Sequence, residues 1–134
     1  MQPHDDPRPH VLDVLARMLE TGDPASMIER LAPGAVVWHN NDKLEVDAAE
    51  NMRRASGLHA LVADVRVAML QRERLSDGWL QRFVIHGTVR ASGLPLAAHN
   101  CLIMHLDDDD RVTRIEEYLD PTFAAQLTAP APAR

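Results

Sequence analysis

The sequence predicts an α+β domain in which helices from the first half of the chain pack on a curved antiparallel sheet and enclose a pocket. One supporting observation is a set of three extended runs between Trp79 and Asp120, rich in Val, Ile, Leu and Thr and separated by short breaks of Gly, Pro, Ser or Asp. The other is a series of amphipathic helical patterns before Trp79. Strands of this length need a hydrophobic face to lie against a partner, and the helices provide one. Polar residues that point between the two layers would then carry the function.

Length and composition indicate a single globular domain over residues 1–134, with loose ends expected at 1–9 and 128–134. The net charge of −6 argues against a nucleic-acid partner, because a protein that reads a phosphate backbone needs a basic face. No apolar run approaches the ~20 residues of a membrane span, and the N-terminus has no apolar signal-peptide core. The lone Cys101 excludes an internal disulfide and fits a reducing compartment, so we expect a cytoplasmic protein with no membrane partner.

The first half of the chain predicts three helices with short strands between them. Apolar residues recur at helical spacing in each helix, and Gly22 is the breaker after the first. Asp47 caps the third helix, with Glu50 as the second member of a capping box. The helices are expected at residues 10–20, 23–32 and 47–62, the last interrupted at Gly57, and the strands at residues 35–39 and 43–46.

The second half predicts four strands and a short final helix. Alternating apolar residues indicate the first strand, and the three extended runs supply the others. The strands are expected at residues 64–74, 79–91, 96–106 and 111–120, and the helix at residues 121–127. The run from Asp107 to Asp110 lacks the spaced oxygens and the glycine pivot of a calcium loop, so we expect a solvated hairpin turn.

The alternation of side chains along a strand shows which polar residues share a face. Asn100 and Glu117 each stand alone on an otherwise apolar strand face. A carboxyl group in such surroundings has its ionised form desolvated and its pKa raised, which makes it a candidate general acid or base. On the strand from residue 79, one face carries Arg82, Val84, His86 and Thr88, and the other carries Gln81, Phe83, Ile85 and Val89.

Each candidate also has a purely structural interpretation. Glu117 would then form an ion pair with an arginine such as Arg82, and Asn100 would satisfy the backbone of a bulge. His39 and His86 would then turn their rings to water. The sequence has no His-x-His or Glu-x-x-His pair and no glycine-rich phosphate loop, so we expect neither a metal site nor a cofactor.

The order helix, helix, AVVWHN, helix and three long strands ending in RVTRIEEYLD resembles a known family. It is similar to the SnoaL-like branch of the nuclear transport factor 2-like superfamily, which includes the ketosteroid isomerases and the limonene epoxide hydrolases. The similarity covers roughly residues 11–127, and its two patches read MIERLAPGAVVWHN and HLDDDDRVTRIEEYLD. It implies a cone-shaped fold with a deep apolar pocket, usually as a dimer through the sheet. Because this fold hosts many activities, the resemblance is specific for the fold and not for the reaction.

Comparison with the ketosteroid isomerases places His39 where those enzymes carry the general-base aspartate. Leu102 stands where they carry the hydrogen-bonding acid of the oxyanion hole. The resemblance therefore implies a different base and no second acid at these two positions.

Comparison with the epoxide hydrolases uses other residues. Trp38 and Asn40 resemble the Tyr-x-Asn pair of those enzymes, and Glu117 resembles their second aspartate. Arg82 matches the arginine of an Arg-x-Asp pair, but Val84 stands in place of its aspartate. The two comparisons differ on whether His39 or its neighbours point into the pocket.

The function we expect is a cofactor-free enzyme acting on an apolar, ring-bearing or polyketide-like small molecule. The reaction would be a proton transfer, as in cyclisation, isomerisation, hydration or hydrolysis. His39 would be the general base and Glu117 the acid or polarising group, while Asn100 and Arg82 would bind a substrate oxygen. The other predicted substrate-binding residues are Trp38, Asn40, His86, Leu102 and Leu119.

Two alternatives remain at this point. One is a non-catalytic member of the same fold that binds a ligand or forms a dimer. The other is a protein-interaction module that uses the exposed face of the sheet. Convergence of the polar groups on one reacting point would favour the enzyme.

Overall fold

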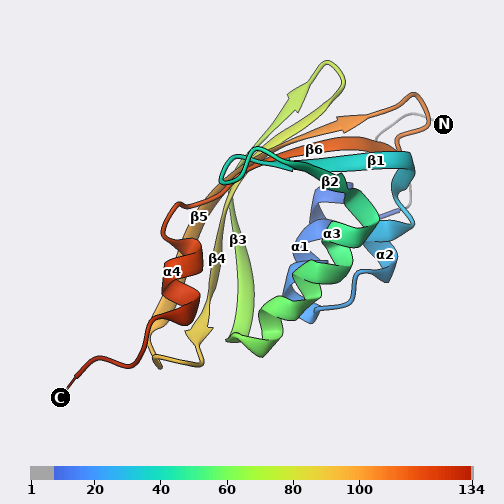
Figure 1. Cartoon of the computed structure of the whole chain (residues 1–134). Coiled ribbons are helices and arrows are strands. Elements are labelled where there is room, and N and C mark those ends of the chain that lie inside the picture. The colour runs from blue at the N-terminus through green and yellow to red at the C-terminus, as the bar shows by residue number, and fades with distance from the viewer. Residues whose placement is uncertain (1–7, 134) are drawn as a thin grey trace.

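A computed structural model describes residues 8–133 and shows helices packed on a bent sheet of six strands (Figure 1). The strands are β1 (Leu31–His39), β2 (Glu45–Asp47), β3 (Val62–Leu75), β4 (Gly78–Val89), β5 (Pro95–Leu106) and β6 (Val112–Tyr118). The helices are α1 (Val11–Thr21), α2 (Ala25–Ile28), α3 (Ala48–Ala55), the 3-10 helix η2 (Ser56–Ala60) and α4 (Phe123–Thr128). Residues 1–7 of the expected N-terminal arm and Arg134 of the C-terminal one lie outside the described residues. The predicted α+β class is confirmed.

The ends of α1 and α3 are set by cap residues in the sequence. His10 precedes α1, and its ring Nδ1 accepts a hydrogen bond from the backbone N–H of Leu12 at 3.1 Å. Gly22 ends α1 with a φ of 78°, a left-handed conformation that glycine adopts without steric cost. The carboxylate of Asp47 accepts from the backbone N–H of Glu50 at 3.0 Å, so the predicted cap of α3 is confirmed.

The order of the strands, β2-β1-β6-β5-β4-β3, brings an early strand beside the last one. The four strands β3 to β6 pair as consecutive antiparallel neighbours, as predicted from the short breaks between them. β1 pairs with β6 in parallel, so the sheet is mixed and not wholly antiparallel as expected. A parallel pair is joined by a long crossover and leaves no turn signal in the sequence, which is why the alternation pattern could not predict it.

Two predicted boundaries near the first strand differ from the structure. α2 ends at Ile28 instead of continuing to residue 32, and β1 begins at Leu31 instead of residue 35. Pro33 and Gly34 lie inside β1, where the register with β6 shifts between Leu31 and Val36. Proline and glycine therefore mark an irregularity within a strand here and not a break before it.

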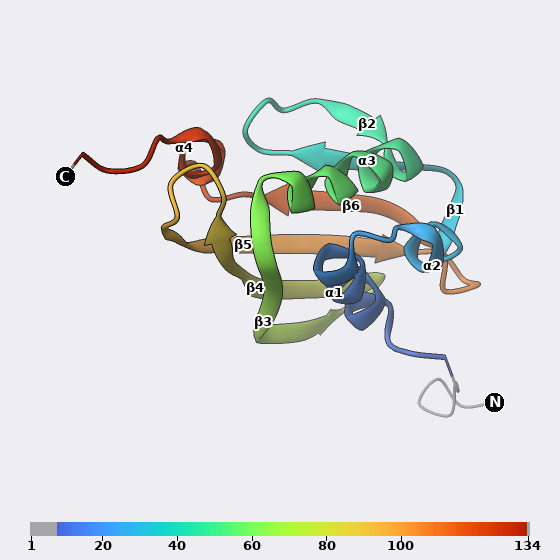
Figure 2. The same ribbon diagram turned by 90° about the horizontal axis from the view of Figure 1, so that it is seen from below.

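The helices α1 and α3 lie on the concave side of the bent sheet, and α4 lies near the turn between β4 and β5 (Figure 1). The view from below shows α1 and α3 in front of the strands (Figure 2). Large apolar side chains from both layers are fully buried between them. These include Leu12, Met27 and Met52 from the helices and Val37, Leu96, Leu102, Met104 and Ile115 from the strands. Each contributes roughly 1.5–3 kcal/mol by leaving water, so this interface holds the two layers in place around the pocket.

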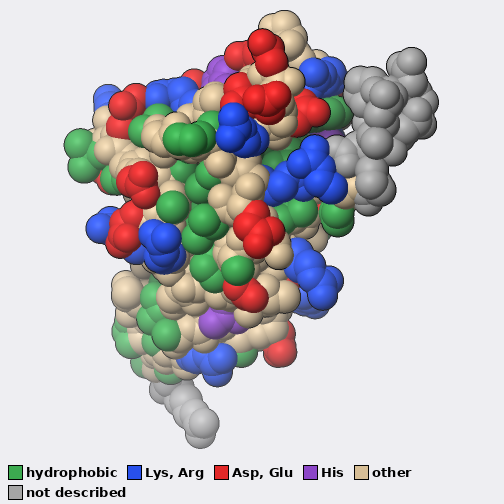
Figure 3. Space-filling view, turned by 90° about the vertical axis from the view of Figure 1, so that its right-hand side faces the viewer, with side chains coloured by type: hydrophobic (Ala, Val, Ile, Leu, Met, Phe, Trp, Pro, Cys, Tyr) green, Lys and Arg blue, Asp and Glu red, His purple; other side chains and the backbone are tan. Residues whose placement is uncertain are grey.

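The helical side of the molecule carries charges of both signs. Lysine, arginine, aspartate and glutamate side chains are scattered over this face, with hydrophobic side chains between them (Figure 3). Among residues 8–133, no helix is long and apolar enough to cross a membrane.

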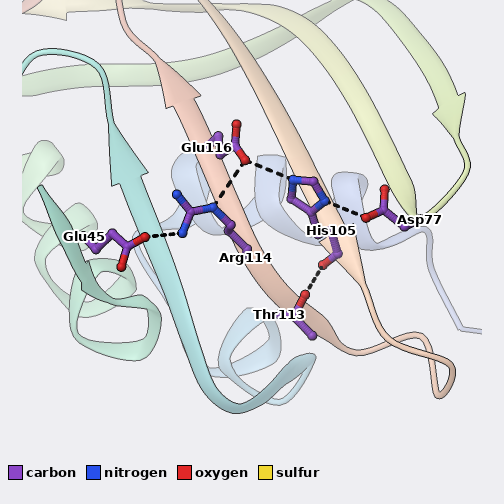
Figure 4. A network of polar contacts seen from close by, with 6 residues as sticks. All are labelled: Glu45, Asp77, His105, Thr113, Arg114 and Glu116. Atoms are coloured by element: carbon purple, nitrogen blue, oxygen red, sulfur yellow. Dashed lines mark hydrogen bonds and ion pairs between the residues drawn. The ribbon is translucent and has the colours of Figure 1, made fainter. Parts of the chain in front are cut away.

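A polar network links strands on the face of the sheet that turns away from the helices (Figure 4). The ring of His105 lies between two carboxylates, with Nδ1 2.8 Å from Asp77 Oδ2 and Nε2 3.1 Å from Glu116 Oε1. Arg114 donates to Glu116 through Nε at 3.3 Å and to Glu45 through Nη1. The network thus joins β2, β6, β5 and the turn before β4 by their side chains.

Candidate functional site

A pocket of about 280 Å³ lies between the helices and the concave face of the sheet. Apolar side chains from α1, α3, η2, β4 and the segment after β6 form most of its wall. Its polar lining residues are His39, Asn51, Arg54, Asn100 and Glu117. The volume lies near the small end of the range for small-molecule sites, roughly 300–1,000 Å³, and a mostly apolar wall with a few polar groups is typical of them.

His39 and Glu117 form a pair at the floor of this pocket. They are direct partners in the parallel register of β1 and β6, and both alternate with buried residues, Val37 and Ile115, on the same face. His39 Nε2 lies 3.4 Å from Glu117 Oε2, and the two side chains are only 16% and 19% exposed. The contact is longer than an ideal N–H···O hydrogen bond, which leaves room for the pair to tighten around a ligand.

The pKa of His39 is raised above its ordinary value of 6.5. The main cause is the interaction with the Glu117 carboxylate; burial opposes it, and the negative charges of Glu117 and Asp42 add to it. The protonated form of the His39 imidazole is therefore favoured beside the carboxylate, compared with a histidine in water.

The side-chain oxygen and the side-chain nitrogen of Asn100 differ in their hydrogen bonding. The residue is 6% exposed, and its Oδ1 accepts a hydrogen bond from the backbone N–H of Asp120 at 3.1 Å. Its Nδ2 is buried and finds no hydrogen-bond acceptor within the described part of the chain. A buried N–H group without an acceptor costs free energy, so this donor is a candidate binding group for an oxygen atom of a ligand.

Asn40 fixes the segment that carries Glu117. Its Oδ1 accepts from the backbone N–H of Leu119 at 2.8 Å, and its backbone N–H donates to the carbonyl of Glu117 at 3.0 Å. Asn40 does not line the pocket, while Leu119 does. Asn40 therefore holds the end of β6 against the end of β1 and so positions Glu117 beside His39.

The comparisons with known proteins come from solved structures. No established family profile matches the sequence, and no curated protein is significantly similar to it. A nuclear transport factor 2-like protein from Burkholderia thailandensis E264 superposes at a TM-score of 0.73 and 16% identity, over 90% of this chain and 95% of that one. A protein with a ketosteroid isomerase-like fold from Catenulispora acidiphila DSM 44928, solved with trimethylamine, gives 0.69 and 14%, over 82% and 85%. A proposed SnoaL-like polyketide cyclase from Shewanella putrefaciens CN-32 gives 0.69 and 12%, over 89% and 93%.

The chain has the nuclear transport factor 2-like fold. The resemblance expected from the sequence is thereby confirmed at the level of the fold. Identities of 12–16% carry no information on the reaction, because this fold hosts many activities.

Two residues predicted to bind substrate lie on the outer face of the sheet, which turns away from the helices. Arg82 and His86 alternate with Phe83 and Ile85, which face the helices. Arg82 is exposed, and its Nε donates to Gln71 Oε1 at 2.9 Å. Neither residue lines the pocket, and the structural alternative of an Arg82–Glu117 ion pair is also wrong. The more apolar face of β4 packs against the helices, and this preference places both residues outside.

Trp38 and Leu102 were also predicted to bind substrate and do not line the pocket. Trp38 points to the outer face, where its ring contacts the edge of Tyr118 with centroids 5.5 Å apart. This orientation settles the direction of β1, since His39 then faces inward. Leu102 is fully buried in the core between the layers, so it supports the sheet and has no access to a ligand.

Sequence reasoning missed Asn51 and Arg54, which the helical wall contributes to the pocket. Asn51, Arg54 and Ala55 follow the spacing i, i+3 and i+4, which places them on one side of α3, and Leu58 of η2 continues this wall. Arg53 and Arg54 are adjacent and both charged, a pattern typical of a solvent-facing side, so the sequence alone does not single out Arg54. Among residues 8–133, no group of three or more His, Cys, Asp or Glu side chains is placed to hold a metal ion.

Proposed function

We propose that this protein is an enzyme that transfers a proton on a compact, largely apolar molecule bearing an oxygen atom. The observation that supports this most is the content of the pocket. A histidine–glutamate pair and a buried amide donor with no acceptor among residues 8–133 lie in one largely apolar cavity. An acid–base pair beside a hydrogen-bond donor is the arrangement needed to form and stabilise an enolate.

In the proposed reaction, the carbonyl oxygen of the substrate accepts a hydrogen bond from Asn100 Nδ2. His39 in its neutral form takes a proton from the adjacent carbon, and the Glu117 carboxylate stabilises the resulting imidazolium. The pair then returns the proton to a different atom, so the cycle consumes nothing. A positioned base contributes roughly 10²–10⁴-fold to such a rate, and one donor to the developing oxyanion roughly 10²–10³-fold.

We infer the substrate class from the apolar walls of the pocket, and the names of structural neighbours support it. One neighbour is a proposed SnoaL-like polyketide cyclase, and another is a proposed isomerase from Bacillus subtilis. Cyclisation and isomerisation next to a carbonyl both begin with the proton removal described above. A ring-bearing ketone or a short polyketide-like compound fits both this chemistry and the small apolar cavity.

The experiment that tests the proposal needs no knowledge of the product. A panel of cyclic ketones is incubated with the protein in D₂O, and exchange of the protons next to the carbonyl is followed by NMR. We expect exchange with the wild type and a loss of roughly 10²-fold or more in His39→Asn and in Glu117→Gln. Glu116→Gln is the matched control, because Glu116 contacts a different histidine, His105, on the outer face. Exchange that survives in both His39→Asn and Glu117→Gln would show the assignment to be wrong.

A ligand-binding protein without catalysis is the second candidate. It is favoured by one observation, namely that His39 and Glu117 are already paired with each other, as in a structural ion pair. In that case ketones would bind in the pocket without exchanging their protons. The same experiment therefore separates the two candidates.

A further inference from the structure

The mouth of the pocket carries a cation that the proton-transfer proposal does not use. Arg54 lines the pocket although its side chain is 70% exposed, so it lies where the cavity opens to solvent. Its Nε is 3.4 Å from Glu50 Oε1. The two terminal nitrogens of its guanidinium make no hydrogen bond or ion pair with any described residue, so both remain available to a ligand.

The neighbouring Arg53 shows that an arginine in the last turn of α3 does not necessarily line the pocket. Both arginines lie in the last turn of α3, where a positive charge favours the helix, and both contact Glu50. Arg53 Nη1 is 3.8 Å from Glu50 Oε2, and the residue does not line the pocket. Helix stability accounts for both residues equally, whereas only Arg54 faces the cavity.

Asn51 adds a second donor to the same wall. It precedes Arg54 by three residues, so the two side chains are neighbours on one face of α3. Asn51 is half-buried, lines the pocket and makes no side-chain hydrogen bond within the described part of the chain. The helical wall therefore presents two sets of N–H donors, while the pair and Asn100 lie on the sheet.

We infer that the pocket binds an apolar carboxylic acid in its ionised form, with the carboxylate at the mouth on Arg54 and Asn51 and the apolar body inside. A carboxylate only accepts hydrogen bonds, and its two oxygens match the fork of a guanidinium. The one acidic side chain in the lining, Glu117, belongs to β6 and lies beside His39 on the sheet, not on the helical wall that would hold the carboxylate. The inference rests on the same pocket as the proposed function and adds a charged group to the substrate.

Calorimetric binding of two matched probes tests this inference. Phenylpropanoate and phenylpropanamide have the same shape and differ in charge. We expect the wild type to bind the acid roughly tenfold more tightly or better, as a charge-assisted contact provides. Arg54→Gln should lose this preference, and Arg53→Gln, the control from the same turn, should keep it.

Equal affinity for the two probes, or no binding of the acid at millimolar concentration, would overturn the inference. So would an equal loss of preference in Arg53→Gln and Arg54→Gln, because the effect would then be a general one of surface charge. Glu117→Gln separates this inference from the proposed function. That variant should lose proton exchange and still prefer the acid, so either idea can fail without the other.

Discussion

His39 and Glu117 meet because of residue-scale features that act together. Each alternates with buried residues along its strand, which turns both side chains toward the helices. Asn40 then holds the ends of the two strands together through the backbone of Glu117 and Leu119. The alternation predicted that Glu117 and Asn100 share the pocket face with apolar residues. It could not predict that His39 is the partner of Glu117, because that contact depends on strands far apart in the sequence.

The pH dependence of proton exchange tests the pair. The base must be neutral, so the rate should rise with pH through the pKa of His39, which lies above 6.5. Glu117→Gln removes the largest cause of this raised pKa, so the rising limb should move to lower pH while the maximal rate falls. The measurement is the exchange rate as a function of pH, with Glu116→Gln as the control. If the rising part of the rate profile stays at the same pH in Glu117→Gln, the role proposed for the His39–Glu117 pair is contradicted.

Asn100→Leu tests whether a buried amide is kept for binding and not for stability. The lost hydrogen bond to Asp120 is offset by removal of the unpaired Nδ2, so we expect the free energy of unfolding to change by less than about 1 kcal/mol. Gln81→Leu, at another buried polar position, should cost about 1–3 kcal/mol, since Gln81 Oε1 accepts from Arg72 Nε at 2.8 Å. Urea denaturation of both variants gives the comparison. A larger loss in Asn100→Leu would mean that Asn100 is structural.

At the scale of elements, the sequence predicted those features that are local. The end of α1 at Gly22, the cap of α3 at Asp47 and the turns between β3, β4, β5 and β6 depend on adjacent residues, and the structure confirms them. The parallel pairing of β1 with β6 and the packed side of α3 depend on the whole fold. Arg54 and Asn51 were missed for this reason, and Arg82 and His86 were placed in the pocket when their strand in fact turns them outward.

We expect the network around His105 to make the free energy of unfolding depend on pH. Its hydrogen bonds to Asp77 and, to a lesser extent, to Glu116 raise the pKa of His105, while burial lowers it. A raised pKa means that the charged form stabilises the folded state below the ordinary value of 6.5. This contribution is lost as the pH rises through the raised pKa.

The free energy of unfolding should therefore fall more steeply for the wild type than for His105→Gln as the pH rises above 6.5. Because His39 contributes with the same sign, the difference between the two proteins isolates His105. Chemical denaturation across this range provides the measurement. Parallel curves for the two proteins would show that the network does not contribute.

At the scale of the whole molecule, no helix of residues 8–133 covers the outer face of the sheet (Figure 1). Trp38 and Tyr118 lie on it, and Leu80 and Ile103, which alternate with buried residues, lie on it as partners in adjacent strands. We propose that two copies of the chain associate through this face. Light scattering should give twice the monomer mass for the wild type and the monomer mass for Tyr118→Glu, with the pocket unaffected. A monomeric wild type would contradict the proposal.

The central claim is that the cavity between α3 and the sheet is a binding site for a small molecule. A crystallographic screen with small fragments tests it most directly. We predict that fragments gather in this cavity with a polar atom within hydrogen-bond distance of Asn100 Nδ2 or of the His39–Glu117 pair. A cavity closed by its own apolar side chains, or fragments bound only elsewhere on the molecule, would contradict the claim.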